Sequence, residues 1–128
     1  MSGPEDPLVW IEKAEEDYQM ARYALRRKPP FTTTACFHAQ QCAEKYLKAL
    51  LVARKQTFPK VHDLQALSDL CNQIGILLPF AVDSLDRLTS HATRTRYPGE
   101  NPTLEEAREA LEIARAVRRF GRKFFGQR

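Results

Sequence analysis

Apolar residues recur every three to four positions along most of this chain, the spacing that places them on one face of an α-helix. The pattern is strongest over residues 31–55. There, small and apolar side chains form one continuous stripe, made up of Ala35, Ala39, Cys42, Ala43, Tyr46, Leu50 and Ala53. Phe37 and Leu51 lie off that stripe among polar residues, so a second face is partly apolar. A helix with two such faces is expected at the centre of a bundle or at a dimer interface.

Four further helices follow from the same periodicity. They are predicted over residues 8–27, 64–74, 79–94 and 103–124. No stretch alternates with a period of two, so no strand is predicted. Because the connections are short, the expected fold class is all-α, an antiparallel up-and-down bundle of four long helices and a shorter one. We expect residues 1–128 to form a single domain, with residues 1–7 as a frayed tail.

The ends of these helices carry recognisable signals. The proline pair at 29–30 stops the first helix, and the threonines at 32–34 offer capping hydroxyls to the second. Gly75 is suited to end the third helix, because glycine readily takes the left-handed backbone that closes many helices. Thr103 and Glu106 have the spacing of a capping box, which predicts the start of the last helix.

Charge and cysteine content limit the function only broadly. The formal net charge of +4 favours an anionic partner weakly. Acids gather at residues 12–17 and bases at 22–28 and 115–128, and the bases fall late in predicted helices, where cations suit the helix dipole. The three cysteines have no ligand spacing, and no secretory signal or long apolar run is present. A cytoplasmic protein with reduced thiols, without metal, cofactor or membrane contact, is therefore expected.

Three short motifs, taken in order, resemble those of the HEPN family of prokaryotic helical domains. They are FHAQQCAEKYLKALL at 37–51, VHDL at 61–64 and RYP at 96–98, and the resemblance extends over about residues 9–125. It implies a small helical domain, often dimeric and often encoded beside a minimal nucleotidyltransferase in toxin–antitoxin-like pairs. It also implies a candidate activity, since many HEPN proteins are metal-independent ribonucleases with an Arg, four to six residues and a His.

The ribonuclease motif is absent from this sequence as written. His62 follows Arg54 with seven residues between them, and His91 follows Arg87 with three. No arginine stands at the required distance before His38. The departure favours binding over catalysis, and Arg87 and His91 stay as the alternative catalytic pair, because an arginine can hold a phosphate while a histidine moves a proton.

Cationic, titratable and aromatic side chains crowd the end of the fourth predicted helix. The candidate nucleotide- or RNA-binding residues are Arg87, His91, Arg94, Arg96 and Tyr97, with His62 as a further contact. Arginines would bind phosphates, and Tyr97 would stack on a base. Arg87 is more simply interpreted as a side chain on a solvated helix face. For Arg96 and Tyr97, ligand binding and a structural role, in which they hold their loop against the bundle, are equally favoured. For His62, a structural role is preferred, either capping of the third helix, which Asp63 could provide instead, or a hydrogen bond to a neighbouring carbonyl.

Two other polar positions are interpreted as structural. His38 lies at the edge of the central stripe and is expected to be a half-buried, hydrogen-bonded histidine. Glu44 and Lys48, one helical turn apart, are expected to form a surface or interface ion pair.

Three functions remain open at this point. The first is the nucleotide- or RNA-binding half of a HEPN/minimal-nucleotidyltransferase pair. The second is an endoribonuclease toxin with a displaced Arg/His pair, and the third is a non-catalytic assembly module. Phe37 and Leu51 further suggest a homodimer formed through the second face of the central helix.

Overall fold

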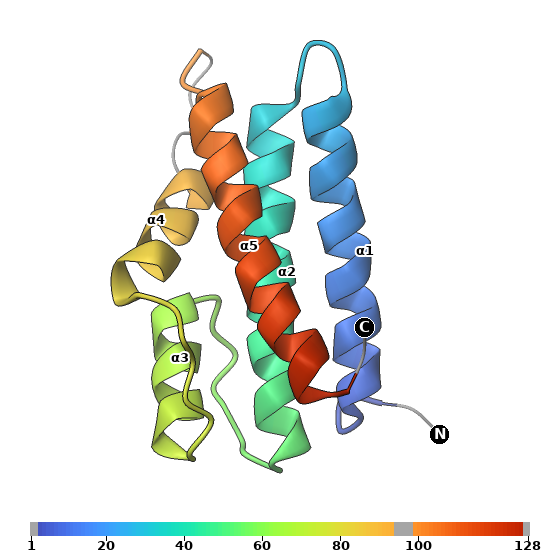
Figure 1. The fold of residues 1–128 in the computed structure, drawn as a ribbon, viewed down its shortest axis with the longest axis vertical. Helices are drawn as coiled ribbons and strands as arrows, with labels where there is room; N and C mark the ends of the chain where they lie inside the picture. The colour runs from blue at the N-terminus through green and yellow to red at the C-terminus, as the bar shows by residue number, and fades with distance from the viewer. Residues whose placement is uncertain (1–2, 94–98, 127–128) are drawn as a thin grey trace.

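The computed structural model describes residues 3–93 and 99–126, and this part of the chain is entirely helical apart from its connections (Figure 1). The helices are α1 (Pro7–Arg26), α2 (Thr32–Ala53), α3 (Leu64–Gln73), α4 (Val82–Thr93) and α5 (Leu104–Phe124). The predicted all-α class is confirmed. The lengths differ from the expectation, because three helices are long and two are short, and α4 begins three residues after Pro79.

Helix α2 is the centre of the bundle, as its two apolar faces predict. It packs against each of the other four helices, and Figure 1 shows it beside α1, with α5 crossing in front of it. Its predicted stripe is buried except at Ala53, which is half-buried. Leu51 was expected on a second exposed face but is fully buried, and both α3 and α4 pack against α2. Phe37 stays exposed.

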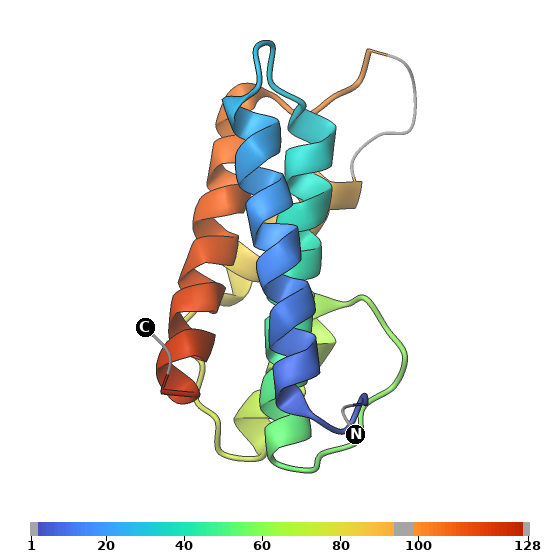
Figure 2. The same ribbon diagram turned by 90° about the vertical axis from the view of Figure 1, so that its right-hand side faces the viewer.

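The direction of α3 departs from a strict up-and-down order. The connection after α2 runs back along the bundle before α3 begins (Figure 2). The side chain of Gln40 donates to the carbonyl of His62 at 3.0 Å, and the thiol of Cys71 lies 3.9 Å from the carbonyl of Leu47. Residues 62 to 71 therefore pass residues 40 to 47 in the same sense, so α3 runs parallel to α2.

Two of the predicted helix ends are found in detail. Thr103 accepts a hydrogen bond from the backbone of Glu106 at 3.1 Å, and the Glu106 side chain accepts from the backbone of Thr103 at 2.8 Å, which completes the capping box. Gly75 has φ of +89°, and the backbone of Ile76 donates to Cys71 at 2.9 Å. This is the Schellman pattern that closes a helix with a left-handed residue.

Two other expectations about ends are wrong. The threonines at 32–34 do not cap α2, whose N-cap is Phe31 and has no side-chain hydrogen bond. Residues 3–6 are not a frayed tail, because Asp6 caps α1 and the indole of Trp10 donates to the carbonyl of Pro4 at 2.8 Å. Proline is well tolerated in the first helical turn, so Pro7 begins the helix instead of preventing it.

The contact between α2 and α5 requires a residue without a side chain. Gly121 of α5 lies directly on the ring of Tyr46 of α2, and a Cβ at position 121 would collide with the ring carbon Cδ1. The Tyr46 ring is fully buried, and its hydroxyl donates to Glu15 of α1. Tyr46 therefore joins the three long helices at one point in the core.

Polar residues in the core follow the predictions in one case and contradict them in another. His38 is half-buried and its Nδ1 lies 2.7 Å from Asp17, as expected of a hydrogen-bonded structural histidine. Glu44 and Lys48 do form an ion pair, 2.9 Å long, but it is buried and does not lie on the surface. The Lys48 ammonium lies beside the edge-to-face rings of Trp10 and Phe58, at 5.6 and 5.7 Å from their centroids.

Candidate functional site

A hollow of about 360 Å³ lies between α2, the start of α3 and the last turn of α4. It is lined by Phe37, Gln40, Gln41, His62, Thr89, Ala92 and Thr93, and most of the surface that these residues present to it is apolar. We call this the α2/α4 hollow. The amide oxygen of Gln40 accepts from the Thr89 hydroxyl at 3.4 Å, which links the two helices across its floor. Hydroxyls, amides and an imidazole give such a site both donors and acceptors for a small polar ligand.

His62 stands at the rim of this hollow with most of its side chain in solvent. Its Nδ1 donates to the buried carboxylate of Glu44, 3.0 Å from each oxygen, and Nε2 has no hydrogen-bond partner within residues 3–93 and 99–126. Asp63, not His62, caps α3. Since Glu44 also accepts from Lys48, the imidazole is oriented by a buried ion pair and is available for a ligand.

The alternative catalytic pair, Arg87 and His91, is directed elsewhere. Both side chains contact Glu109 of α5, Arg87 through Nε at 3.2 Å and His91 through Nε2 at 2.7 Å. The imidazole of His91 is only 8% exposed, and its Nδ1 lies 4.0 Å from Glu106. The hydrogen bond from His91 lowers the pKa of Glu109 against the opposing effect of burial, and the charge of Arg87 lowers it further. Glu109 is therefore a carboxylate that neutralises the pair.

The sequence-derived candidates thus separate into three groups. His62 lines the α2/α4 hollow, whereas Arg87 and His91 lie on the side of α4 that faces α5. Arg94, Arg96 and Tyr97 lie outside the described residues. Thr93, the last described residue before them, lines the hollow.

Sequence reasoning missed most of the hollow. Gln40, Gln41, Thr89 and Thr93 have no catalytic or ligand-binding motif, and only their position on facing helices brings them together. A usable signal existed for Phe37, because a large aromatic residue off the core stripe of a central helix is unusual. Its side chain is 49% exposed beside the hollow.

With this geometry in place, comparison with known proteins identifies the fold family. The model of the HEPN domain matches residues 8–124, which is nearly the entire chain. The chain belongs to the HEPN domain family. The family resemblance carried by the motifs at 37–51, 61–64 and 96–98 is therefore confirmed.

Individual proteins similar to this chain include two solved structures and one further relative. The crystal structure of TT1696 from Thermus thermophilus superposes with a TM-score of 0.73 at 29% identity, over 91% of this chain and 96% of that one. ST0689, an archaeal HEPN homologue, gives 0.67 at 26% identity, over 93% and 97%. A protein of Methanocaldococcus jannaschii with the name "Putative toxin MJ1304" is 28% identical over 85% of this chain and 81% of its own length.

The helices of this HEPN protein do not have the length and composition of membrane spans over the part that the structure describes. Within residues 3–93 and 99–126, none is long and apolar enough to cross a bilayer. The described part likewise holds no group of three or more His, Cys, Asp or Glu side chains with the arrangement of a metal site.

All three cysteines are buried thiols, and burial raises the pKa of Cys71 to about 12.

Proposed function

We propose that this HEPN protein is the nucleotide- or RNA-binding half of a toxin–antitoxin-like pair, whose other half is a minimal nucleotidyltransferase in the cytoplasm. The observation that carries the proposal is the α2/α4 hollow, whose lining includes polar and aromatic side chains and which lies next to Thr93, where the Arg94–Tyr97 segment begins. The relative named as a toxin in Methanocaldococcus jannaschii supports a toxin-like role.

The hollow can recognise a base and its sugar by distinct contacts. The half-exposed ring of Phe37 offers a stacking face, and the Gln41 amide and the hydroxyl of Thr93 can bond base edges or ribose hydroxyls. His62 presents at the rim a ring nitrogen, Nε2, that no described residue binds. In this proposal Arg94 and Arg96 bind the phosphates and Tyr97 adds a second stacking surface, as the sequence predicts.

Binding is favoured over RNA cleavage by the state of Arg87 and His91. A general base must reach the proton that it removes, and His91 is buried against two glutamates of α5. Arg87, which would hold the scissile phosphate, is paired with one of those glutamates. The ribonuclease alternative therefore lacks a free catalytic pair among the described residues. Incubation of total RNA with the purified protein, without metal, checks this: cleavage that His91→Ala abolishes would contradict the binding role.

The binding site is tested by titration with mononucleotides and short RNA on wild type, Arg96→Ala and Phe37→Ala. Arg26→Ala is the matched control, because Arg26 is exposed on α1 and has no side-chain partner among the described residues. We expect both site variants to lose binding with unchanged melting. Because salt weakens phosphate contacts, the loss caused by Arg96→Ala should be largest at low salt and should shrink as salt rises. If Arg96→Ala binds as well as wild type, Arg96 is not part of the site. If wild type binds neither mononucleotides nor short RNA, residues 96–98 serve only to attach their loop to the bundle.

The homodimer is a separate proposal that now rests on Phe37 alone, since Leu51 is buried. Light scattering of wild type and Phe37→Asp at high micromolar concentration distinguishes the two uses of this ring. A halved mass in the variant supports a dimer interface, whereas an unchanged monomer mass with lost nucleotide binding supports stacking.

The nucleotidyltransferase partner is tested in two ways. The first is a search for a short nucleotidyltransferase reading frame adjacent on the genome, and the second is co-purification of its product with this protein.

A further inference from the structure

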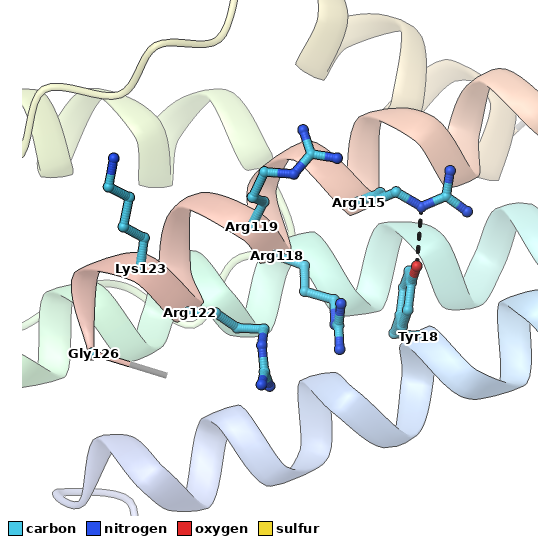
Figure 3. Close-up of a pocket in the computed structure, with 7 residues that line it drawn as sticks. All are labelled: Tyr18, Arg115, Arg118, Arg119, Arg122, Lys123 and Gly126. Atoms are coloured by element: carbon cyan, nitrogen blue, oxygen red, sulfur yellow. Dashed lines mark hydrogen bonds between the residues drawn. The ribbon is translucent and has the colours of Figure 1, made fainter. Parts of the chain in front are cut away.

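A second hollow, of about 510 Å³, lies between α1 and α5 and is lined almost entirely by cations. Five cations come from α5 and an aromatic ring comes from α1: Arg115, Arg118, Arg119, Arg122, Lys123 and Tyr18. In Figure 3, Arg118 and Arg122 point toward α1, whereas Arg119 and Lys123 lie on the outer side of α5. We call this the α1/α5 groove. The α5 residues follow one another at alternating spacings of three and one, so helical geometry alone places them on one side. No residue of the groove belongs to the α2/α4 hollow.

The inner row of the groove is fixed by hydrogen bonds. Arg118 binds both carboxylate oxygens of Glu15, through Nε at 2.7 Å and Nη2 at 2.9 Å, and Arg122 lies 3.6 Å from the same group. Burial raises the pKa of Glu15, but the hydrogen bonds from Arg118 and Tyr46 and the charge of Arg118 lower it overall. Arg115 donates to the Tyr18 hydroxyl at 3.0 Å and also pairs with Glu112. These guanidinium groups are therefore held in place before any ligand arrives.

The outer row is free. Arg119 and Lys123 are exposed and form no ion pair within the described part of the chain. Five cations line the groove, and two carboxylates, Glu15 and Glu112, pair with the inner ones, which leaves an excess of three positive charges. Such an excess on one face attracts anions and concentrates them there. The sequence pattern explained the bases at 115–128 as charges that suit the end of a helix. It did not predict that Arg118 and Arg122 of α5 would contact Glu15 of α1.

We propose that the α1/α5 groove binds a linear anion that carries several phosphate groups in succession. Arg115 and Lys123 are eight residues apart, about 12 Å along the helix axis, so the row is long enough for more than one phosphate. Arginine forks match phosphate oxygens in pairs, and four of the five cations are arginines.

The lining also argues against two other ligands. Among the described residues, no aliphatic side chain lines the groove, whereas protein interfaces have an apolar core, so an acidic protein segment would lack an anchor. The Tyr18 ring is buried and covered by Arg118, whose guanidinium carbon lies 4.4 Å from the ring centroid. Bases therefore have no stacking platform on this ring. A ligand held only through phosphates can be a single-stranded nucleic acid or inorganic polyphosphate, and the experiment must distinguish these sources.

The test measures binding of three anions to the full chain by fluorescence anisotropy or competition: an oligouridylate, inorganic polyphosphate of similar phosphate number, and polyglutamate. The groove variant is Arg119→Glu with Lys123→Glu, since both side chains are exposed and lie outside the inner row. The matched control is Lys13→Glu with Lys28→Glu, two exposed lysines that line neither hollow and change the net charge by the same amount. Thermal melting of all three proteins confirms that each one is folded.

We expect wild type to bind at least one phosphate polymer and the groove variant to bind it about tenfold or more weakly at roughly 50 mM salt. For a single-stranded nucleic acid, the logarithmic salt slope should fall by about 1.4 when two contacts are lost. The control should bind like wild type. Binding of one polymer only identifies the source of the phosphates.

Three outcomes would overturn the assignment. They are no binding of either phosphate polymer by wild type, equal weakening in the groove and control variants, and polyglutamate binding as tight as that of the phosphates. The result is independent of the proposed function, because mononucleotide binding in the α2/α4 hollow is read out with Phe37→Ala. Either site can fail while the other stands.

Discussion

Helix α5 takes part in two arginine-containing faces that differ in their charge balance. Near its start, Glu109 faces Arg87 and His91 of α4 and pairs with both, so that face is closed and nearly neutral. Near its end, Arg118 and Arg122 share one carboxylate, that of Glu15, and the outer cations have none within the described chain. A cluster of cations in the sequence therefore does not define an anion site. The carboxylates supplied by the facing helix decide whether positive charge remains.

Both faces depend on the burial of α2, so the largest effect should come from its core. Leu50 is fully buried in the centre of the bundle. Leu50→Asp places an unpaired charge there and should cost several kcal/mol of a total stability of about 5–15 kcal/mol. Urea unfolding followed by circular dichroism measures the change. If the variant unfolds at the wild-type midpoint, the assignment of this core face is wrong.

The next effect separates paired from unpaired arginines within the α1/α5 groove. Arg118→Ala removes the bidentate partner of Glu15 and should lower the free energy of unfolding by about 1–3 kcal/mol. Arg119→Ala removes an exposed side chain and should change it by less than about 0.5 kcal/mol. Chemical denaturation of both variants tests the contrast. Equal losses would show that the inner and outer rows are not energetically distinct.

The third prediction concerns acid. The pKa of Glu15 in the folded protein lies below its ordinary value of 4.5, so its ion pairing contributes full stability above that pH. This contribution is lost as the pH falls through the lower folded-state value. Melting temperatures measured from neutral to acidic pH should therefore drop more steeply below about 4.5 for wild type than for Glu15→Gln. Parallel acid limbs would mean that Glu15 does not contribute to the acid sensitivity.

A small effect on stability should also come from opening the closed face between α4 and α5. Glu109→Gln keeps an oxygen that can accept from His91 but removes the charge that balances Arg87. Since both partners of the Arg87 pair are about half exposed, we expect a stability loss below about 1 kcal/mol. When Glu109→Gln is added to the Arg119→Glu/Lys123→Glu variant, Arg87 is no longer neutralised. The triple variant should therefore recover weak, salt-sensitive polyphosphate binding. A triple variant that still binds nothing would show that Glu109 is not what closes this face.

The sequence was sufficient for the local parts of this structure. Periodicity located all five helices, and Gly75 and Thr103 marked two ends correctly, because these signals involve residues within one or two turns. The parallel direction of α3 was not predictable from them, since it depends on contacts such as that between Gln40 and His62. The wrong assignment of Glu44–Lys48 to the surface has the same origin. The rings of Trp10 and Phe58, remote in sequence, cover the pair.

Only single residues of the candidate sites, recognisable by their own side-chain chemistry, could be predicted from the sequence. His62 was named and lies at the α2/α4 hollow, but its lining partners come from two helices about 50 residues apart. The α1/α5 groove depends on Arg118 meeting Glu15, a pair separated by 103 positions. A run of bases late in one helix gives no indication of which side will face a neighbour or how many carboxylates that neighbour carries.

The glycine at the crossing of α2 and α5 constrains how this sequence can evolve. Because Gly121 lies on the Tyr46 ring, no single substitution at position 121 is free of collision. A smaller residue at position 46 would make room, but it would remove the hydroxyl that binds Glu15 and so disturb the arginines of the groove. We therefore expect positions 46 and 121 to change together in the family's history, or not at all, with position 15 following them. A substitution record of relatives would show this as a linked trio spanning α1, α2 and α5.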